Sequence, residues 1–277
     1  MYQIFNFLIN TNTLVALGAF SLYKVTEILF NISDFYIGCF VFFSTLCAYN
    51  YMSSSLYLNI DKDFSFRVSS NKSIGTHLIT LLSAIIVIYL IVLLGFVFLK
   101  LVLPLLVIGI LYPLYIKING VNYNIRSIPL FKIFLISLCW THLTLGVPLL
   151  YHNYGIDYFF IDSLFQRFLF IVAISIPFDI RDIYIDNITT LPKSLGIWSS
   201  KLFAWFCLFI IDVLLIIDLI NGVVSLSIFL GLFLTIELTS IIIWISKPNN
   251  PKVFYGIMVE GLSIIMCLFV YTFNYFL

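Results

Sequence analysis

Residues 84–111 read AIIVIYLIVLLGFVFLKLVLPLLVIGIL, and Lys100 is the one charged residue among them. The hydrocarbon core of a bilayer is crossed by a helix of roughly 20 apolar residues. The stretch, together with the apolar residues before it, is therefore long enough for two crossings. The interruption at Lys100 predicts a tight helical hairpin made of spans 75–99 and 101–117.

The rest of the chain has the same character. Of its 277 residues 62% are hydrophobic and 10% are charged, whereas a soluble domain carries about 25% charged residues. No soluble domain or internal repeat interrupts the apolar segments, so residues 1–277 are expected to form one all-α transmembrane domain, a single bundle of nine helices. The predicted spans are 9–30, 35–57, 75–99, 101–117, 130–151, 161–178, 198–220, 223–246 and 253–276.

The basic residues predict the orientation of this bundle. Eleven of the 14 Lys and Arg residues fall in the connections between spans 2 and 3, 4 and 5, 6 and 7, or 8 and 9, or at the span ends next to these connections, all on one side. By the positive-inside rule that side is cytoplasmic, which also places the N-terminus there. Loops 2–3, 4–5 and 6–7 are the long ones, and long loops usually carry function. We therefore expect a plasma (inner) membrane protein with its active side facing the cytoplasm. The net charge of +1 provides no field that would attract nucleic acid.

Loop 6–7 carries an unusual concentration of charge. Asp179, Asp182 and Asp186 are spaced at i, i+3 and i+7, which places them on one face if the segment is helical. Three carboxylates on one face repel one another unless a cation lies between them, and a Mg²⁺ ion that also binds phosphate is a suitable ligand. Arg181 and Lys193 would then neutralise phosphate oxygens. The alternative is a solvated acidic loop that caps span 7.

The run Asp179-Ile-Arg-Asp-Ile-Tyr-Ile-Asp186, followed by Thr190-Leu-Pro-Lys-Ser-Leu-Gly196, resembles the second aspartate-rich motif of the UbiA-type intramembrane prenyltransferase superfamily. In that family the motif also lies between helices 6 and 7 of a nine-helix bundle. The resemblance implies transfer of an isoprenoid chain from a prenyl diphosphate to a lipophilic acceptor within the membrane, with Mg²⁺ as cofactor. It assigns Asp179, Asp182 and Asp186 as the catalytic, metal-binding residues.

The first aspartate-rich motif of that family should follow span 2. Asn50 matches it, but Tyr51, Ser54 and Leu58 stand where the family has aspartates. Asp61 and Asp63 follow, either as partial substitutes or as solvated loop charges. Loss of one aspartate cluster would reduce the electrostatic stabilisation of the departing pyrophosphate by several kcal/mol.

Basic residues in two loops complete the predicted diphosphate site. Those after the first motif resemble the family's phosphate contacts, and Lys117 follows Tyr112 nearly as in its Tyr-x-x-x-Lys pair, one residue further on. A lysine that extends to the membrane surface is the alternative for Lys117. The full predicted set for diphosphate is Asn50, Arg67, Lys72, Lys117, Arg181 and Lys193.

Several ionisable residues fall inside the predicted spans. Lys24 and Glu27 are spaced to form a pair, and His142 lies in the middle of span 5. Ionisable groups in a membrane are functional candidates by default. Acids in spans 7–9 would also suit the ion path of a transporter: Asp212, Asp218, Glu237 and Glu260.

Three functions remain open from the sequence. The first is a UbiA-like prenyltransferase, and the second is a terpene-cyclase-like relative that needs no acceptor. The third is a non-catalytic protein that binds or transports isoprenoid or other lipid on the same scaffold. The degenerate first motif favours the third, and the complete second motif opposes it, because a protein without a Mg²⁺ site has no reason to keep three such carboxylates.

Overall fold

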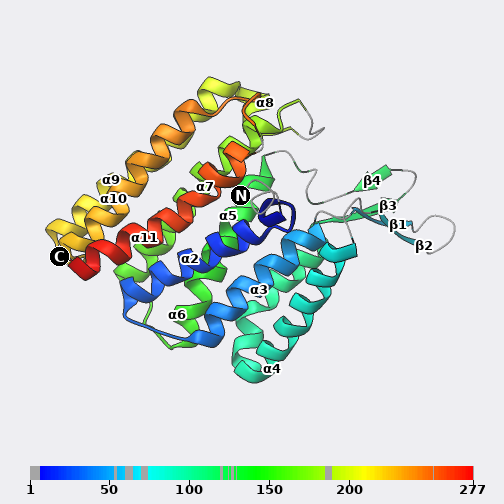
Figure 1. Cartoon of the computed structure of the whole chain (residues 1–277), viewed down its shortest axis with the longest axis horizontal. Helices are drawn as coiled ribbons and strands as arrows, with labels where there is room; N and C mark the ends of the chain where they lie inside the picture. The colour runs from blue at the N-terminus through cyan, green and yellow to red at the C-terminus, as the bar shows by residue number, and fades with distance from the viewer. Residues whose placement is uncertain are drawn as a thin grey trace.

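The computed structural model describes residues 7–52, 55–59, 65–69, 74–118, 121–123, 125, 128, 130–184, 189–251 and 253–276, with the backbone alone at 55–59, 65–69, 115–118 and 121–123. These residues are predominantly helical (Figure 1). Among them are eight helices long and apolar enough to cross a membrane. The prediction of a helical integral membrane protein is therefore confirmed.

The helices follow one another with short connections along most of the chain. Three of the crossings are built from more than one helical segment or contain a break. The elements are α2 (Thr13–Phe30), α3 (Phe35–Met52), α4 (Ile74–Leu111), α5 (Phe131–Thr141) continued by the π-helix η2 (His142–Gly146) and α6 (Val147–Tyr151), α7 (Tyr158–Arg181), the short α8 (Leu191–Leu195), α9 (Ile197–Ile220), α10 (Leu226–Ile245), and the π-helix η3 (Phe254–Val259) continued by α11 (Gly261–Phe276).

The predicted span 75–99 and the first part of the predicted span 101–117 both fall within α4, which is why the count is eight rather than nine. The break in α4 lies at Gly95, with φ 83° and ψ −175°, and not at Lys100. Glycine adopts this backbone conformation without the steric penalty that a Cβ would bring. The helix ends at Leu111, so the predicted end of the fourth span at residue 117 is wrong: Leu114–Ile118 form a strand.

A four-stranded sheet, which the sequence analysis did not predict, joins loops 2–3 and 4–5. Its strands are β1 (Ser55–Asn59), β2 (Ser65–Ser69), β3 (Leu114–Ile118) and β4 (Val121–Tyr123), in the order β2-β1-β3-β4. The strand β1 is antiparallel to β2 and parallel to β3. The sequence carried a signal for it, because Asn119-Gly120 between two apolar-alternating segments is a strong hairpin marker.

The sheet requires α4 to reverse direction. A straight helix of 38 residues would extend about 57 Å at 1.5 Å per residue. However, Ser69 and Leu114, which flank α4, pair with the adjacent β1 residues Ser55 and Leu56. Both ends of α4 therefore lie near the same edge of the bundle, and the chain turns back at Gly95 (Figure 1).

Helix α7 forms the centre of the largest of three apolar clusters among the described residues. Its buried residues pack with side chains of α9, α10 and α11, while the second cluster joins α2, α3 and α4. Close approach of helices in a membrane relies on small residues, because lipid provides no hydrophobic drive for helix association. At Gly231 of α10, a Cβ would lie 2.7 Å from the Val270 Cα of α11, so the two backbones are in contact there.

We expect Gly231→Ala to destabilise the protein by about 1–3 kcal/mol, because α10 and α11 would have to separate. The measurement is thermal unfolding of the purified protein in detergent. Gly109→Ala on α4 is the matched control, since a Cβ there meets nothing within 4 Å. Equal unfolding temperatures for the two variants would contradict the close contact of α10 with α11.

Candidate functional site

The three long loops meet at one end of the bundle. The pairing of β1 with β3 joins loop 2–3 to loop 4–5. Loop 4–5 is in turn joined to loop 6–7, because Leu130 N donates a hydrogen bond to Thr189 O at 3.2 Å. The three loops are therefore in contact with one another, and the side of the membrane that they face stays a prediction.

Helix α7 ends earlier than the spacing of the acidic run suggested. Its last residue is Arg181, and Asp182 is the C-cap, with φ −89° and ψ 6°. Residues 182–184 form a turn. A single helical face holding Asp179, Asp182 and Asp186 is therefore not formed, because the helix that would align them stops before the second aspartate. Asp186 lies outside the described residues.

Asp179 lies in the last turn of α7 and is buried. Its Oδ1 accepts a hydrogen bond from Lys132 Nζ at 3.0 Å, and the two side chains are 3% and 16% exposed. Lys132 belongs to the first turn of α5. In the sequence this lysine is only one of the positive charges expected on the cytoplasmic side, whereas in the structure it is the ion-pair partner of the first aspartate.

Asp182 forms a two-pronged ion pair with its neighbour. Arg181 Nε and Nη2 donate to Asp182 Oδ1 and Oδ2 at 2.7 and 2.8 Å. The guanidinium also lies over two aromatic rings, 5.3 Å from the centroid of Phe178 and 5.6 Å from that of Tyr255. These contacts hold the guanidinium in place through its charge and through its planar face.

A third carboxyl group belongs to the same region. Glu260 lies within electrostatic reach of Arg181 and of Tyr49, and its Oε2 is buried without a hydrogen-bond partner among the described residues. Glu260 directly follows η3, and π-helical turns are frequent at functional sites. From the sequence, Glu260 was predicted as an intramembrane acid, but not as a neighbour of the acidic run.

Tyr49 is a further residue that the sequence analysis did not select. Its hydroxyl accepts a hydrogen bond from Trp140 Nε1 at 2.9 Å, which joins the end of α3 to α5. Its position next to Asn50 at the end of α3 could have suggested it, since the first motif should begin there.

Asn50 is buried and contacts the residues before α2. Its Oδ1 accepts from Asn12 Nδ2 at 2.9 Å, and its Nδ2 donates to Thr11 O at 3.0 Å. These bonds give Asn50 a role in fixing the chain that enters α2. Its assignment to diphosphate stays a prediction.

The remaining predicted residues are placed only in part. The backbone of Arg67 in β2 pairs with Tyr57, and that of Lys117 in β3 pairs with Asn59, so both strands flank β1. Lys193 is exposed on α8. Outside the described residues lie Ser54, Asp61, Asp63, Lys72 and Asp186.

The described residues do not by themselves form a metal site. Within them no group of three His, Cys, Asp or Glu side chains is placed to hold an ion. Asp179 and Asp182 each contact a cationic side chain instead. A Mg²⁺ ion at the end of the bundle where the three loops meet would need further oxygen ligands, from Asp186 or from a bound diphosphate.

Comparison of the chain with models of protein families, with curated proteins and with solved structures finds no match.

Proposed function

We propose that the protein is a UbiA-like prenyltransferase of the plasma membrane that moves an isoprenoid chain from a prenyl diphosphate to a lipophilic acceptor, with Mg²⁺ as cofactor. The observation that carries the proposal is the acidic run 179–186 with its Thr190–Gly196 continuation, situated where three long loops meet. The excess of basic residues in those loops favours a cytoplasmic mouth.

The reversal of α4 supports the proposed architecture. If the two arms of α4 on either side of Gly95 cross the membrane separately, the eight long helices make nine crossings. That number agrees with the nine-helix bundle implied by the resemblance. It also puts loops 2–3, 4–5 and 6–7 on one side of the membrane, as the proposal requires.

The roles of the side chains follow from their charges and supports. Arg181, held by Asp182 and by the rings of Phe178 and Tyr255, presents a fixed cation to phosphate oxygens. Lys132 of α5, which precedes Arg181 in the chain, and the exposed Lys193 of α8, which follows it, add point charges. Mg²⁺ bound with the diphosphate would contribute further positive charge where the pyrophosphate departs. Arg67 and Lys117 belong to β2 and β3, the strands on either side of β1, and we keep them as proposed phosphate contacts.

The test is turnover of a prenyl diphosphate by purified protein with and without Mg²⁺. We expect Asp182→Asn to lower turnover by roughly 100-fold or more, because it removes a proposed Mg²⁺ ligand and the two-pronged support of the Arg181 guanidinium. Asp157→Asn is the matched control at the other end of α7: Asp157 is the N-cap there and accepts from Phe160 N at 2.8 Å, and asparagine caps equally well. Turnover by Asp182→Asn equal to that of the control would refute the site.

The second candidate is a non-catalytic isoprenoid-binding or lipid-transport protein on the same scaffold. It is favoured by the ion pairs of Asp179 with Lys132 and of Asp182 with Arg181, since both carboxylates have cationic partners within the chain. Calorimetric titration with Mg²⁺ and a non-hydrolysable prenyl diphosphate measures binding, and together with the turnover assay it separates the two functions. Binding without turnover supports the second candidate, whereas a cyclic hydrocarbon formed without acceptor identifies the cyclase alternative.

A further inference from the structure

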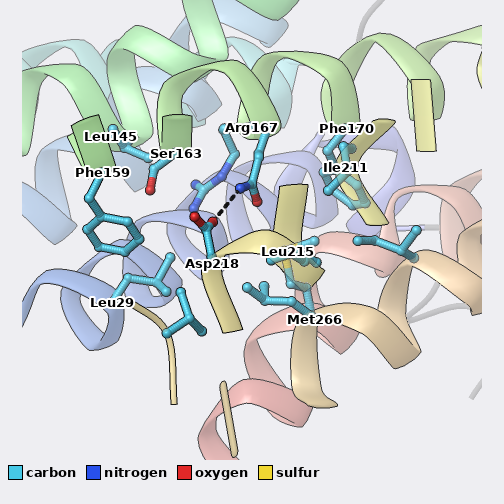
Figure 2. Close-up of a pocket in the computed structure, with 14 residues that line it drawn as sticks. Leu29, Leu145, Phe159, Ser163, Arg167, Phe170, Ile211, Leu215, Asp218 and Met266 are labelled. Atoms are coloured by element: carbon cyan, nitrogen blue, oxygen red, sulfur yellow. Dashed lines mark hydrogen bonds between the residues drawn. The ribbon is translucent and has the colours of Figure 1, made fainter. Parts of the chain in front are cut away.

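A second polar site lies inside the bundle, far from the acidic run. A cavity with about 40 Å³ of space for the centre of a water molecule is lined by residues of α2, α7, α9, α10 and α11 (Figure 2). Its polar lining comes from Ser163, Gln166 and Arg167 of α7 and from Asp218 of α9. Arg167 and Asp179 are about 18 Å apart along α7, at 1.5 Å per residue. The cavity and the loop mouth are therefore separate places.

Two carboxyl groups are joined by one amide in this cluster. Gln166 Nε2 donates to Asp218 Oδ2 at 2.9 Å, and it donates a second, short hydrogen bond to Asp162 Oδ2 (Figure 2 shows the bond to Asp218). Two oxygens bonded to the same nitrogen can be at most about 6 Å apart, twice the length of a hydrogen bond. Asp162 and Asp218 are both buried, and two buried carboxylates this close repel each other strongly.

Asp218 has a free acceptor that points to a ligand. Its side chain is fully buried and lines the cavity, and Oδ1 has no hydrogen-bond partner among the described residues. A buried carboxylate oxygen without a partner is costly. The cavity next to it has room for an ion or a water molecule, because a water needs about 10–15 Å³ of such space.

The charges of the cluster do not cancel when both of its carboxyl groups are ionised. Arg167 is buried, and its guanidinium donates to the neutral acceptors Leu22 O, Thr144 Oγ1 and Thr26 Oγ1 at 2.8, 3.2 and 3.3 Å. The nearby titratable groups Tyr158 and Cys267 are uncharged in their ordinary states. Two ionised carboxylates and one guanidinium leave a single negative charge, so one further positive charge makes the cluster neutral.

We propose that Gln166 and Asp218 bind one monovalent metal cation of the sodium type, with water, in this cavity, and that Asp162, bonded to Gln166 beside the cavity, contributes negative charge. A water molecule alone would give Asp218 Oδ1 a partner but no neutralising charge. A proton shared between the two Oδ2 atoms would neutralise the pair but leave Oδ1 without a partner. A hydrated cation supplies both, and carboxylate, amide and hydroxyl oxygens are the ligands that hard cations prefer.

The experiment is thermal unfolding of the full chain in detergent, with NaCl or KCl replacing choline chloride at constant ionic strength and pH. Because an ion that binds only the folded state stabilises it, we expect a saturable rise in the unfolding temperature of about 5 °C. Asp218→Asn, which keeps the shape of the side chain and removes its charge, should abolish this rise. The matched control is Asp212→Asn on the same helix, which should respond like the wild type.

A second measurement keeps the proposal testable if Asp218→Asn fails to fold. Equilibrium binding of radioactive sodium to the wild-type protein should saturate at one ion per chain and should be displaced by excess unlabelled NaCl. The proposal is overturned if neither monovalent ion changes stability, if only divalent ions do, or if the response persists in Asp218→Asn. A response to pH without any response to monovalent salt would overturn it in favour of a shared proton.

Discussion

Replacing Asp179 by alanine is expected to destabilise the protein by about 3–5 kcal/mol, because removal of one partner from a buried ion pair leaves the other charge uncompensated. The charge left behind is that of Lys132, whose side chain is 16% exposed and which lies 3.0 Å from Asp179 in the native protein. The pair also joins the start of α5 to the end of α7. Thermal unfolding in detergent measures the loss.

A double variant separates the structural role of this pair from a role in catalysis. Asp179→Ala combined with Lys132→Met removes both charges, and it should recover part of the stability lost in the single variant. If the prenyltransferase proposal is right, the double variant stays inactive although it is folded. Recovered stability together with recovered turnover would show that Asp179 acts only as the partner of Lys132.

The second large effect is expected at Arg167, where Arg167→Leu should also cost about 3–5 kcal/mol. Its guanidinium joins α7 to the backbone of α2 at Leu22 and to the hydroxyls of Thr26 and Thr144. Leucine would leave these acceptors without their donor and would leave the carboxyl groups of the cavity without a balancing cation. The unfolding temperature in detergent measures this change.

Two control variants distinguish buried from surface charge. Arg167→Lys keeps the charge but has fewer donors in a different geometry, so its stability should lie between those of the wild type and Arg167→Leu. Lys100→Met removes an exposed cation that lies 4.6 Å from the ring centroid of Phe96, and it should leave the unfolding temperature nearly unchanged. Equal effects at positions 100 and 167 would contradict the structural role of Arg167.

The helical part of the fold was predictable because hydropathy in a membrane chain is a local property. The bounds of α9, Ile197–Ile220, differ from the predicted 198–220 by one residue. The turn within α4 was placed at the charged Lys100, but it lies at Gly95, because reversing a helix depends on backbone freedom rather than on polarity. The strands were missed because each is only three to five residues long and gains its stability from partners far along the chain.

The sequence identified the charged residues of interest, but it predicted only some of their interaction partners. The pair of Lys24 with Glu27 was expected from its spacing and is present, since it depends on one helical turn. The pairs of Asp179 with Lys132 and of Gln166 with Asp218 join different helices. Their formation depends on which helices are neighbours, which no spacing within a single segment reveals.

The amino-acid sequence by itself determined that the chain is a helical membrane protein with a charged mouth between its sixth and seventh predicted spans, because apolar length and charge are properties of contiguous residues. Only the tertiary structure decided that Asp179 has a lysine partner, that Asp182 follows the end of α7, and that two buried carboxyl groups share Gln166 at the edge of a cavity. The physical reason is that burial and charge balance depend on which side chains are close in space. In a helical bundle, these side chains come from helices that are distant in the sequence.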